Sequence, residues 1–373
     1  MINTFRLVQN FLTLGLIDGI HGKESDVAKE MVRRFTVLGL ESRIDEAGST
    51  FGGNTGNIHA RLEGTVDVQP VLLCAHTDTV QSTKGLKHVL QNGTIATDGT
   101  TILGGDDRSG LAIILEILQT LHDEKIPHGP IEVLCTVCEE AGMHGAKFVK
   151  RSDFSAPFGF VFDCQASPGN YIVEAPAAVS FKATVKGRSA HAAVSPEKGI
   201  HAIEIASKAI AALRLGRWDH TGMMNIGTIH GGTSINVVPD LVEITGETRN
   251  ANEEKLQYQI DFIKKAFHTE AAELGGSIDL TFTEKYGGYQ FTDDNPMIRI
   301  ASTAIREAGL EPTPLKYAGG SDANVLNKNG IPMLNLGIGF KNAHSYQEYI
   351  AVEDLIAAAQ IGFNIVRQIA KKN

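Results

Sequence analysis

The chain has 373 residues, of which 42% are hydrophobic and 21% charged, and its 34 basic and 43 acidic side chains give a formal net charge of −9 at pH 7. This composition excludes a disordered, collagen-like or coiled-coil chain, and at ~100–200 residues per domain the length favours about two globular domains. An acidic chain without clusters of lysine and arginine is a poor ligand for phosphate backbones or anionic lipid, so we expect neither nucleic acid nor a membrane as a partner.

The N-terminal region is the one candidate for a targeting segment. Residues 7–17 are mostly apolar, but polar residues interrupt the run and no small-residue cleavage pattern follows it. No segment of the sequence reaches the ~18 consecutive apolar residues of a spanning helix. Phe5, Val8, Phe11 and Leu12 instead fit one face of an amphipathic helix. We therefore expect a cytoplasmic protein that begins with a helix.

The first half of the chain alternates apolar runs with helical patterns. Short, wholly apolar runs are typical of strands that are covered on both faces. On this basis we expect buried strands at 70–75, 131–138 and 158–162, and helices at 22–40 and 109–122. Strands in alternation with helices predict an α/β domain with a mixed, largely parallel sheet flanked by helices.

The pattern changes near residue 178. Residues 179–186 alternate strictly between apolar and polar side chains, which indicates a strand with one solvent-exposed face in an antiparallel sheet. The elements expected after it are a helix at 196–215, strands at 224–229 and 241–248, a helix at 253–274 and a strand at 278–282. This order predicts a ferredoxin-like α+β unit.

The α/β pattern returns after residue 288. Helices are expected at 295–308 and 352–370, and an apolar strand is expected at 331–336. We therefore interpret the α+β unit as an insertion. The expected domains are an α/β domain in two parts, 1–177 and 289–373, and an inserted domain at 178–288.

Cys135 and Cys138 form a CxxC pair, which raises the possibility of a zinc or redox site. If residues 131–138 are a strand, these two thiols face opposite sides, and no second CxxC exists in the sequence to complete a four-thiolate site. We interpret all four cysteines, with Cys74 and Cys164, as buried free thiols.

Five polar segments stand at or just past the carboxyl ends of the expected buried strands, which is where open α/β sheets place their ligand crevice. Each has an ordinary alternative, such as a structural hydrogen bond, a helix cap or a solvated surface pair. The segments contain His76 and Asp78, the pair Asp106 and Asp107, the pair Glu139 and Glu140, Asp163, and His344.

Their combination favours metal chemistry. Two histidines and three carboxylates are the ligand set of a two-zinc hydrolase. Two divalent ions carry four positive charges, and Asp106, Glu140 and Asp163 supply three negative ones. A bridging hydroxide, the nucleophile that such sites generate at neutral pH, would balance the remaining charge. Glu139 then lies beside a ligand and is free to accept a proton, and it follows an uncharged run in which burial of a carboxylate is costly.

These motifs together resemble the M20 family of dinuclear zinc peptidases, and within it most closely the peptidase T (tripeptidase) branch. The resemblance covers essentially the whole chain in the same order. The resemblance rests on the motifs HTDTV (76–80), GGDDRSG (104–110), TVCEEAGMHGAK (136–147), the Asp163 segment and AHSYQEY (343–349). The resemblance implies a metal-dependent exopeptidase that acts on short peptides, and a homodimer in which the inserted unit is the lid or dimerisation domain.

The resemblance also implies a ligand scheme. Asp106 bridges two Zn²⁺ ions, in whose place Co²⁺ or Mn²⁺ can serve. His76 and Asp163 complete one metal site, while Glu140 and His344 complete the other.

Further roles follow from the same resemblance. Glu139 is the general base of the reaction, and Asp78 orients the ring of His76. In the inserted unit, His191, Asn236 and Arg249 match residues that bind substrate. A planar guanidinium suits a substrate carboxylate, and an imidazole suits a developing oxyanion.

The substrate class stays open at this point. Around Asp163 the sequence FDCQASPGN differs from the VDGG-like form of peptidase T. A dipeptidase or carboxypeptidase, or an amidohydrolase of N-acyl amino acids, could use the same metal site. A metal-free relative that only binds ligands is a further alternative from another functional class.

Overall fold

The computed structural model describes residues 1–371, and within them the chain divides into two compact units. Unit 1 comprises Met1–Val173, Phe291–Leu315 and the described part of Ser321–Asn373, and unit 2 comprises Glu174–Gln290 and Lys316–Gly320. These breaks differ by a few residues from those expected after 177 and 288. Lys316–Gly320 belongs to unit 2 because the Lys316 ammonium pairs with the Glu174 carboxylate at 2.8 Å and the Tyr317 N–H donates to the Glu174 carbonyl.

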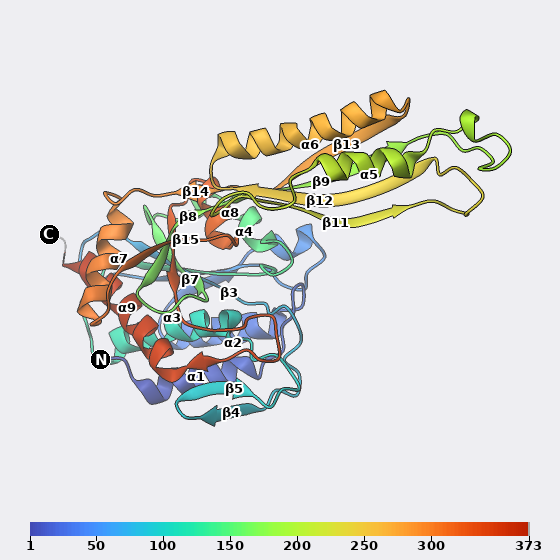
Figure 1. Ribbon diagram of the computed structural model, residues 1–373. Coiled ribbons are helices and arrows are strands. Elements are labelled where there is room, and N and C mark those ends of the chain that lie inside the picture. The colour runs from blue at the N-terminus through green and yellow to red at the C-terminus, as the bar shows by residue number, and fades with distance from the viewer. Residues whose placement is uncertain (372–373) are drawn as a thin grey trace. The chain divides into compact units, whose positions relative to one another are not determined.

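The central sheet of unit 1 is mixed and has its parallel strands in the middle (Figure 1). In order across the sheet, its strands are β1 (Glu41–Ile44), β2 (Ile58–Leu62), β6 (Ile131–Thr136), β3 (Val71–His76), β7 (Gly159–Cys164), β16 (Met333–Gly337) and β8 (Asn170–Ala175). Strands β6, β3, β7 and β16 run parallel, whereas β1, β2 and β8 pair antiparallel with their neighbours. Every residue of β3 and β6 is buried, as the apolar runs predicted. The expected sheet class is confirmed.

Helices cover both faces of this sheet. They are α1 (Thr4–Gly15), α2 (Ser25–Val37), α3 (Gly105–Asp123), α4 (His144–Phe148), α7 (Pro296–Glu307), α8 (Asp322–Lys328) and α9 (Val352–Ala370). The connection from β3 to β6 carries α3, and the connection from β6 to β7 runs back across β3 and carries α4. Because such crossovers are right-handed, α3 and α4 lie on opposite faces of the sheet (Figure 1). Helix α3 packs against α1 and α9 and is almost wholly buried.

Several edge elements of the chain have no strong signal in the sequence. Strands β4 (His88–Gln91), β5 (Thr94–Thr97) and β17 (Ile350–Ala351) form a small sheet, and β14 (Tyr289–Gln290) and β15 (Thr313–Lys316) pair with β8. None of these short strands was predicted. No helix among residues 1–371 has both the length and the apolar character needed to cross a membrane.

Unit 2 has its own sheet and its own hydrophobic core. Its elements are β9 (Ala177–Lys186), α5 (Ala202–Ala212), β10 (Gly216–Arg217), β11 (Met223–Gly231), β12 (Leu241–Asn250), α6 (Glu253–Glu273) and β13 (Ser277–Tyr286). The antiparallel sheet has the order β10-β11-β12-β9-β13. Without the two-residue β10, this is the strand order of a ferredoxin-like fold, and Figure 1 shows α5 and α6 along the sheet.

Two local expectations were wrong. The helix expected at 196–215 is a short 3-10 helix, Pro196–Lys198, followed after a break by α5. The break is stabilised by backbone pairing of Arg188 with Ile200. In α1, Phe5 is 75% exposed, because the buried face is formed by Leu7, Phe11 and Leu14.

The cysteine interpretation agrees with the structure. All four cysteines are buried free thiols. Cys138 lies beyond the end of β6, in a turn with a positive φ of 55°.

Candidate metal centre and active site

Polar residues gather where the parallel strands of unit 1 end. His76 is the last residue of β3, Glu139 and Glu140 follow β6, and Asp163 is the fifth residue of β7. Because these strands run parallel, their carboxyl ends meet at one edge of the sheet. The strand order of the fold therefore brings together residues that are up to 87 positions apart in the sequence.

Asp106, in the first turn of α3, lies between two histidines. Its Oδ1 is 2.9 Å from Nε2 of His76, and its Oδ2 is 3.4 Å from Nε2 of His344. Each of these imidazole nitrogens faces a second carboxylate. Nε2 of His76 is 3.8 Å from Oδ1 of Asp163, and Nε2 of His344 is 2.9 Å from Oε2 of Glu140. The five residues expected as ligands thus form one continuous cluster in which Asp106 contacts both histidines.

The spacing of these atoms fits metal ions. Two ligand atoms that are each 2.0–2.1 Å from one tetrahedral ion lie about 3.3 Å apart, and the four separations of 2.9–3.8 Å bracket this value. Two groups of candidate ligand atoms lie within 4.8 Å of one another, and both contain His76: one includes Asp106 and Glu140, the other Asp107 and Asp163. In addition, Oε1 of Glu140 is buried without a hydrogen-bond partner. Imidazole and carboxylate donors of this kind suit zinc, cobalt or manganese.

The local excess of negative charge also calls for cations. Burial raises the pKa of Glu139 and of Asp163 well above the usual range of a carboxyl group. Among the lysines and arginines of residues 1–371, only Arg108 is buried. Burial lowers the pKa of its guanidinium to about 10, so it remains charged at neutral pH. One arginine cannot balance the carboxylates, and divalent cations would complete the neutralisation.

The two histidines respond to the same charges. Burial alone would lower the pKa of His76, but its contacts with Asp106 and Asp78 raise that pKa well above the usual value. Hydrogen bonds to Asp106 and Glu140 raise the pKa of His344 to about 10. In the metal-free protein the neighbouring carboxylates therefore favour the protonated, positively charged form of both rings.

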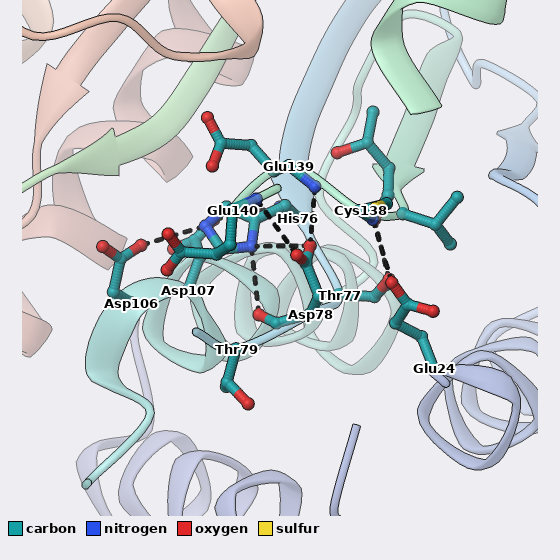
Figure 2. A network of polar contacts seen from close by, with 12 residues as sticks. Glu24, His76, Thr77, Asp78, Thr79, Asp106, Asp107, Cys138, Glu139 and Glu140 are labelled. Carbon is teal, nitrogen blue, oxygen red and sulfur yellow. Dashed lines mark hydrogen bonds and ion pairs between the residues drawn. The ribbon is translucent and has the colours of Figure 1, made fainter. Parts of the chain in front are cut away.

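Asp78 connects His76 with the two glutamates, as Figure 2 shows. Its Oδ1 accepts a hydrogen bond from the Glu139 N–H at 2.9 Å, and its Oδ2 accepts one from the Glu140 N–H at 3.0 Å. Nδ1 of His76 lies 3.1 Å from the Asp78 carbonyl oxygen and 3.4 Å from its Oδ1. The fully buried Asp78 therefore contacts the ring of His76 mainly through its backbone and the glutamate segment through its carboxylate.

Asp107 is a site residue to which the sequence analysis gave no role. Its Oδ2 accepts from the His76 N–H at 3.1 Å, and its Oδ1 accepts from the Gly110 N–H at 3.0 Å. A Cβ on Gly110 would lie 2.4 Å from the Phe162 carbonyl oxygen and 2.5 Å from Asp107 Oδ1, so this position requires glycine. The sequence feature that could have indicated a role for Asp107 is the second aspartate of GGDD, because a helix cap requires only one aspartate.

Glu348 is a second such residue. It is 1% exposed, and its carboxylate accepts hydrogen bonds from three backbone N–H groups. Oε2 accepts from Leu103 and Gly104 at 3.0 and 2.8 Å, and Oε1 accepts from Asp106 at 2.9 Å. Glu348 thus connects the loop that contains His344 with the loop that contains Asp106. Glu348 lies within the motif AHSYQEY, but the sequence does not indicate its distant hydrogen-bond partners.

The residues expected to bind substrate lie in unit 2. The N–H of Ala192 donates to the Asn236 carbonyl at 2.9 Å, so the segments of His191 and Asn236 are neighbours. Arg249 lies near the far end of β12 and donates from Nη2 to both carboxylate oxygens of Glu247. At about 3.3 Å per residue, Arg249 is roughly 26 Å along the strand from Leu241. Within unit 2, therefore, His191 and Asn236 lie together and Arg249 does not lie beside them.

The chain is similar to known proteins over essentially its whole length. The model of peptidase family M20/M25/M40 matches residues 72–368. The chain is similar to aminopeptidase PepT of Bacillus cereus ATCC 10987, with 39% identity, a TM-score of 0.95 and coverage of 99% of this chain and 100% of the other. A tripeptidase from Staphylococcus aureus Mu50 has 36% identity, a TM-score of 0.96 and full coverage of both chains. YqjE of Bacillus subtilis strain 168 is 40% identical over the whole of both chains.

Proposed function

Because the chain belongs to peptidase family M20/M25/M40 and is a metal-dependent peptidase, we propose that it is a two-zinc exopeptidase for short peptides. The observation that carries the two-ion proposal is the position of Asp106, whose two oxygens each face a different histidine. The names of the similar PepT and tripeptidase structures support a free amino terminus and a length of three residues for the substrate.

His76, Asp106 and Asp163 would hold one ion, and His344, Asp106 and Glu140 the other. When bound, the two ions would supply a water that is acidic enough to act as a nucleophile at neutral pH, together with Lewis-acid polarisation of the scissile carbonyl. The close contacts of each histidine with two carboxylates support this assignment, as does the unpartnered oxygen of Glu140.

Glu139 is proposed as the general base. Its carboxylate belongs to neither cluster of candidate ligands, although its backbone adjoins Glu140. Burial raises its pKa, which favours a group that accepts a proton from water and passes it to the leaving amine. Asp78 would fix the backbone of Glu139 and the ring of His76.

The inserted unit is proposed as the lid and dimerisation domain of a cytoplasmic homodimer. Arg249 would bind a substrate carboxylate through its planar fork, while His191 would stabilise the oxyanion and Asn236 would contact the peptide. The exposure of His191 and Asn236 supports contact with a ligand rather than a core role.

The decisive experiment combines metal removal with a panel of substrates. The chelator-treated protein should lose activity and regain it with two equivalents of Zn²⁺ per chain. We expect cleavage of tripeptides, loss of cleavage when the amino terminus is acetylated, and only a partial fall in kcat/KM, about 10-fold, when amidation removes the carboxylate proposed to bind Arg249. Hydrolysis that ignores chelation would contradict the mechanism. Preferential hydrolysis of dipeptides or N-acyl amino acids would support the alternative substrate classes.

A further inference from the structure

Glu24 has a buried carboxylate that does not cap the neighbouring helix α2. The residue directly precedes α2, a position where an acidic side chain ordinarily accepts a hydrogen bond from the first turn. Glu24 makes no such capping bond. It is 0% exposed, so its side chain turns into the protein rather than toward solvent. The carboxylate therefore has a role other than the start of the helix.

Its hydrogen bonds lead to the active site. Oε1 of Glu24 accepts from the N–H of Gly22 and from the N–H of Cys138, both at 2.9 Å. Cys138 has a φ of 55°, which is uncommon for a residue other than glycine, and it directly precedes Glu139. Glu24 thus holds the backbone where the chain leaves β6 and turns toward the two glutamates.

Together, Glu24 and Asp78 hold three consecutive peptide groups. Glu24 accepts the N–H of Cys138, and Asp78 accepts those of Glu139 and Glu140. Figure 2 shows both carboxylates at this short segment, with the side chain of Glu139 extending away from them. With its peptide groups fixed, the segment also fixes the direction in which the Glu139 side chain leaves the backbone.

This arrangement is costly for a purely structural contact. Oε2 of Glu24 is buried without a hydrogen-bond partner. Burial, and then the charge of Asp78, raise the pKa of Glu24. The buried guanidinium of Arg108, which donates to the carbonyls of Thr77 and Ile17, supplies a compensating positive charge.

We propose that Glu24 is a positioning residue for Glu139, which it orients through the amide of Cys138. The inference rests on the proposed function, since it gives Glu24 this role only if Glu139 moves the proton. It extends the active site to a residue that precedes the 72–368 segment matched by the family model.

The test is a double-mutant cycle between Glu24 and Glu139. Glu24→Ala removes the acceptor, so kcat should fall at least ~10-fold, as expected when a catalytic group is displaced by a fraction of an ångström. KM should stay within about 2-fold and the zinc content should stay at two equivalents. In the Glu139→Gln background the same change should have no further effect on kcat. Glu24→Gln keeps an acceptor oxygen and should stay within about 3-fold of the parent enzyme.

Glu132 provides the matched control. It is also buried and also accepts two backbone N–H groups, from Ser155 at 3.0 Å and Ala156 at 2.9 Å, but it lies at the opposite end of β6. Glu132→Ala should lower the unfolding midpoint without a change in kcat. If Glu24→Ala does not fold, Glu24→Asp replaces it, because it retains the charge but withdraws the carboxylate by one methylene.

Three results would overturn the proposal. These are an unchanged kcat in Glu24→Ala or Glu24→Asp, an equal loss in the Glu139→Gln background, and an equal loss of kcat in Glu132→Ala. A Glu139→Gln enzyme with full activity would instead refute the general base, and the role of Glu24 would fail with it. Failure of the positioning role is therefore detected with the Glu24 variants, and failure of the general base is detected with Glu139→Gln.

Discussion

The two units hold their candidate functional residues in different ways. In unit 1, His76 is 1% exposed and Asp78 is 0% exposed, and their partners come from distant segments of the chain. In unit 2, His191 is exposed, and its Nδ1 accepts hydrogen bonds from the N–H groups two and three residues later. Arg249 pairs with Glu247 on the same strand.

This difference has a functional meaning. Side chains held by distant segments are fixed before a ligand arrives, which is what a metal centre and a general base require. Side chains held by sequence neighbours can exchange those contacts for a ligand at low cost. Substitutions in unit 1 should therefore change metal content and kcat, whereas substitutions in unit 2 should change KM.

The strongest test of this contrast is Asp106→Asn. Loss of the shared carboxylate should abolish binding of both ions and lower kcat/KM by more than about 1,000-fold. Zinc content by atomic emission and hydrolysis of a tripeptide measure the two effects. Asp123→Asn, at the other and exposed end of α3, is the control and should retain both ions. Full zinc occupancy in Asp106→Asn would contradict the shared-ligand assignment.

Glu139→Gln should separate proton transfer from metal binding. We expect kcat to fall ~100-fold to 10,000-fold, because a general base is lost, with two zinc ions retained. Since burial raises the pKa of Glu139, the neutral amide should also raise the unfolding midpoint of the metal-free protein. Differential scanning calorimetry and steady-state kinetics test the two parts. A lower midpoint together with lost zinc would assign Glu139 to the metal centre instead.

Glu348→Gln should weaken the metal centre without removal of a ligand. Its carboxylate accepts three N–H groups around Asp106, and an amide has only one acceptor oxygen for them. We expect zinc affinity to fall ~10–100-fold, measured by competition with a chromogenic chelator. Gln347→Ala, the exposed neighbour, should leave the affinity unchanged.

Arg249→Ala should act on substrate alone. Loss of a charged hydrogen bond to a substrate carboxylate should lower kcat/KM about 10-fold or more, mainly through KM, with zinc content unchanged. Arg217→Ala, which changes an exposed arginine of the same unit, should have no effect. A carboxyl-amidated peptide should show no difference between Arg249→Ala and the parent enzyme. If it does, Arg249 contacts another part of the substrate.

The smallest expected effect concerns stability and pH in unit 2. Burial alone would raise the pKa of Asp219, but hydrogen bonds from Lys255, Gly222 and Thr221 lower it to about 2. The carboxylate therefore stabilises the fold above pH ~4, and this contribution is lost as the pH falls toward 2. Asp219→Asn should reduce the free energy of unfolding by less than about 1 kcal/mol at pH 7, because Lys255 is exposed and Asp219 is partly exposed, so solvent screens the pair. Urea unfolding at pH 7 and pH 2 should show the difference only at pH 7.

The sequence predicted the parts of the fold whose signal is local. Wholly apolar runs identified β3 and β6, and strict alternation identified β9. The helix expected at 196–215 was wrong because backbone pairing near Ile200, a tertiary contact, overrides the local pattern. Short strands such as β4 and β17 carry too few residues for a recognisable period.

The candidate site likewise contains residues that the sequence could identify and residues that it could not. The ligand types at strand ends could be recognised, and the structure brings these residues together, although their chemical roles stay predictions. Glu24, Asp107 and Glu348 were not assigned because each acts on backbone N–H groups. Such a contact leaves no pattern in the sequence of either partner, and the Glu24 and Cys138 pair is 114 residues apart.

The span between His76 and His344 has a consequence for biosynthesis. These residues are 268 positions apart, and Glu348 follows the second of them. At about 5–20 residues per second, a ribosome needs roughly 13–54 s to make the chain between the two histidines. During this interval the nascent chain would contain only part of the proposed metal centre. If both histidines hold the metal ions as proposed, the complete metal centre can form only after the segment that contains His344 has been made.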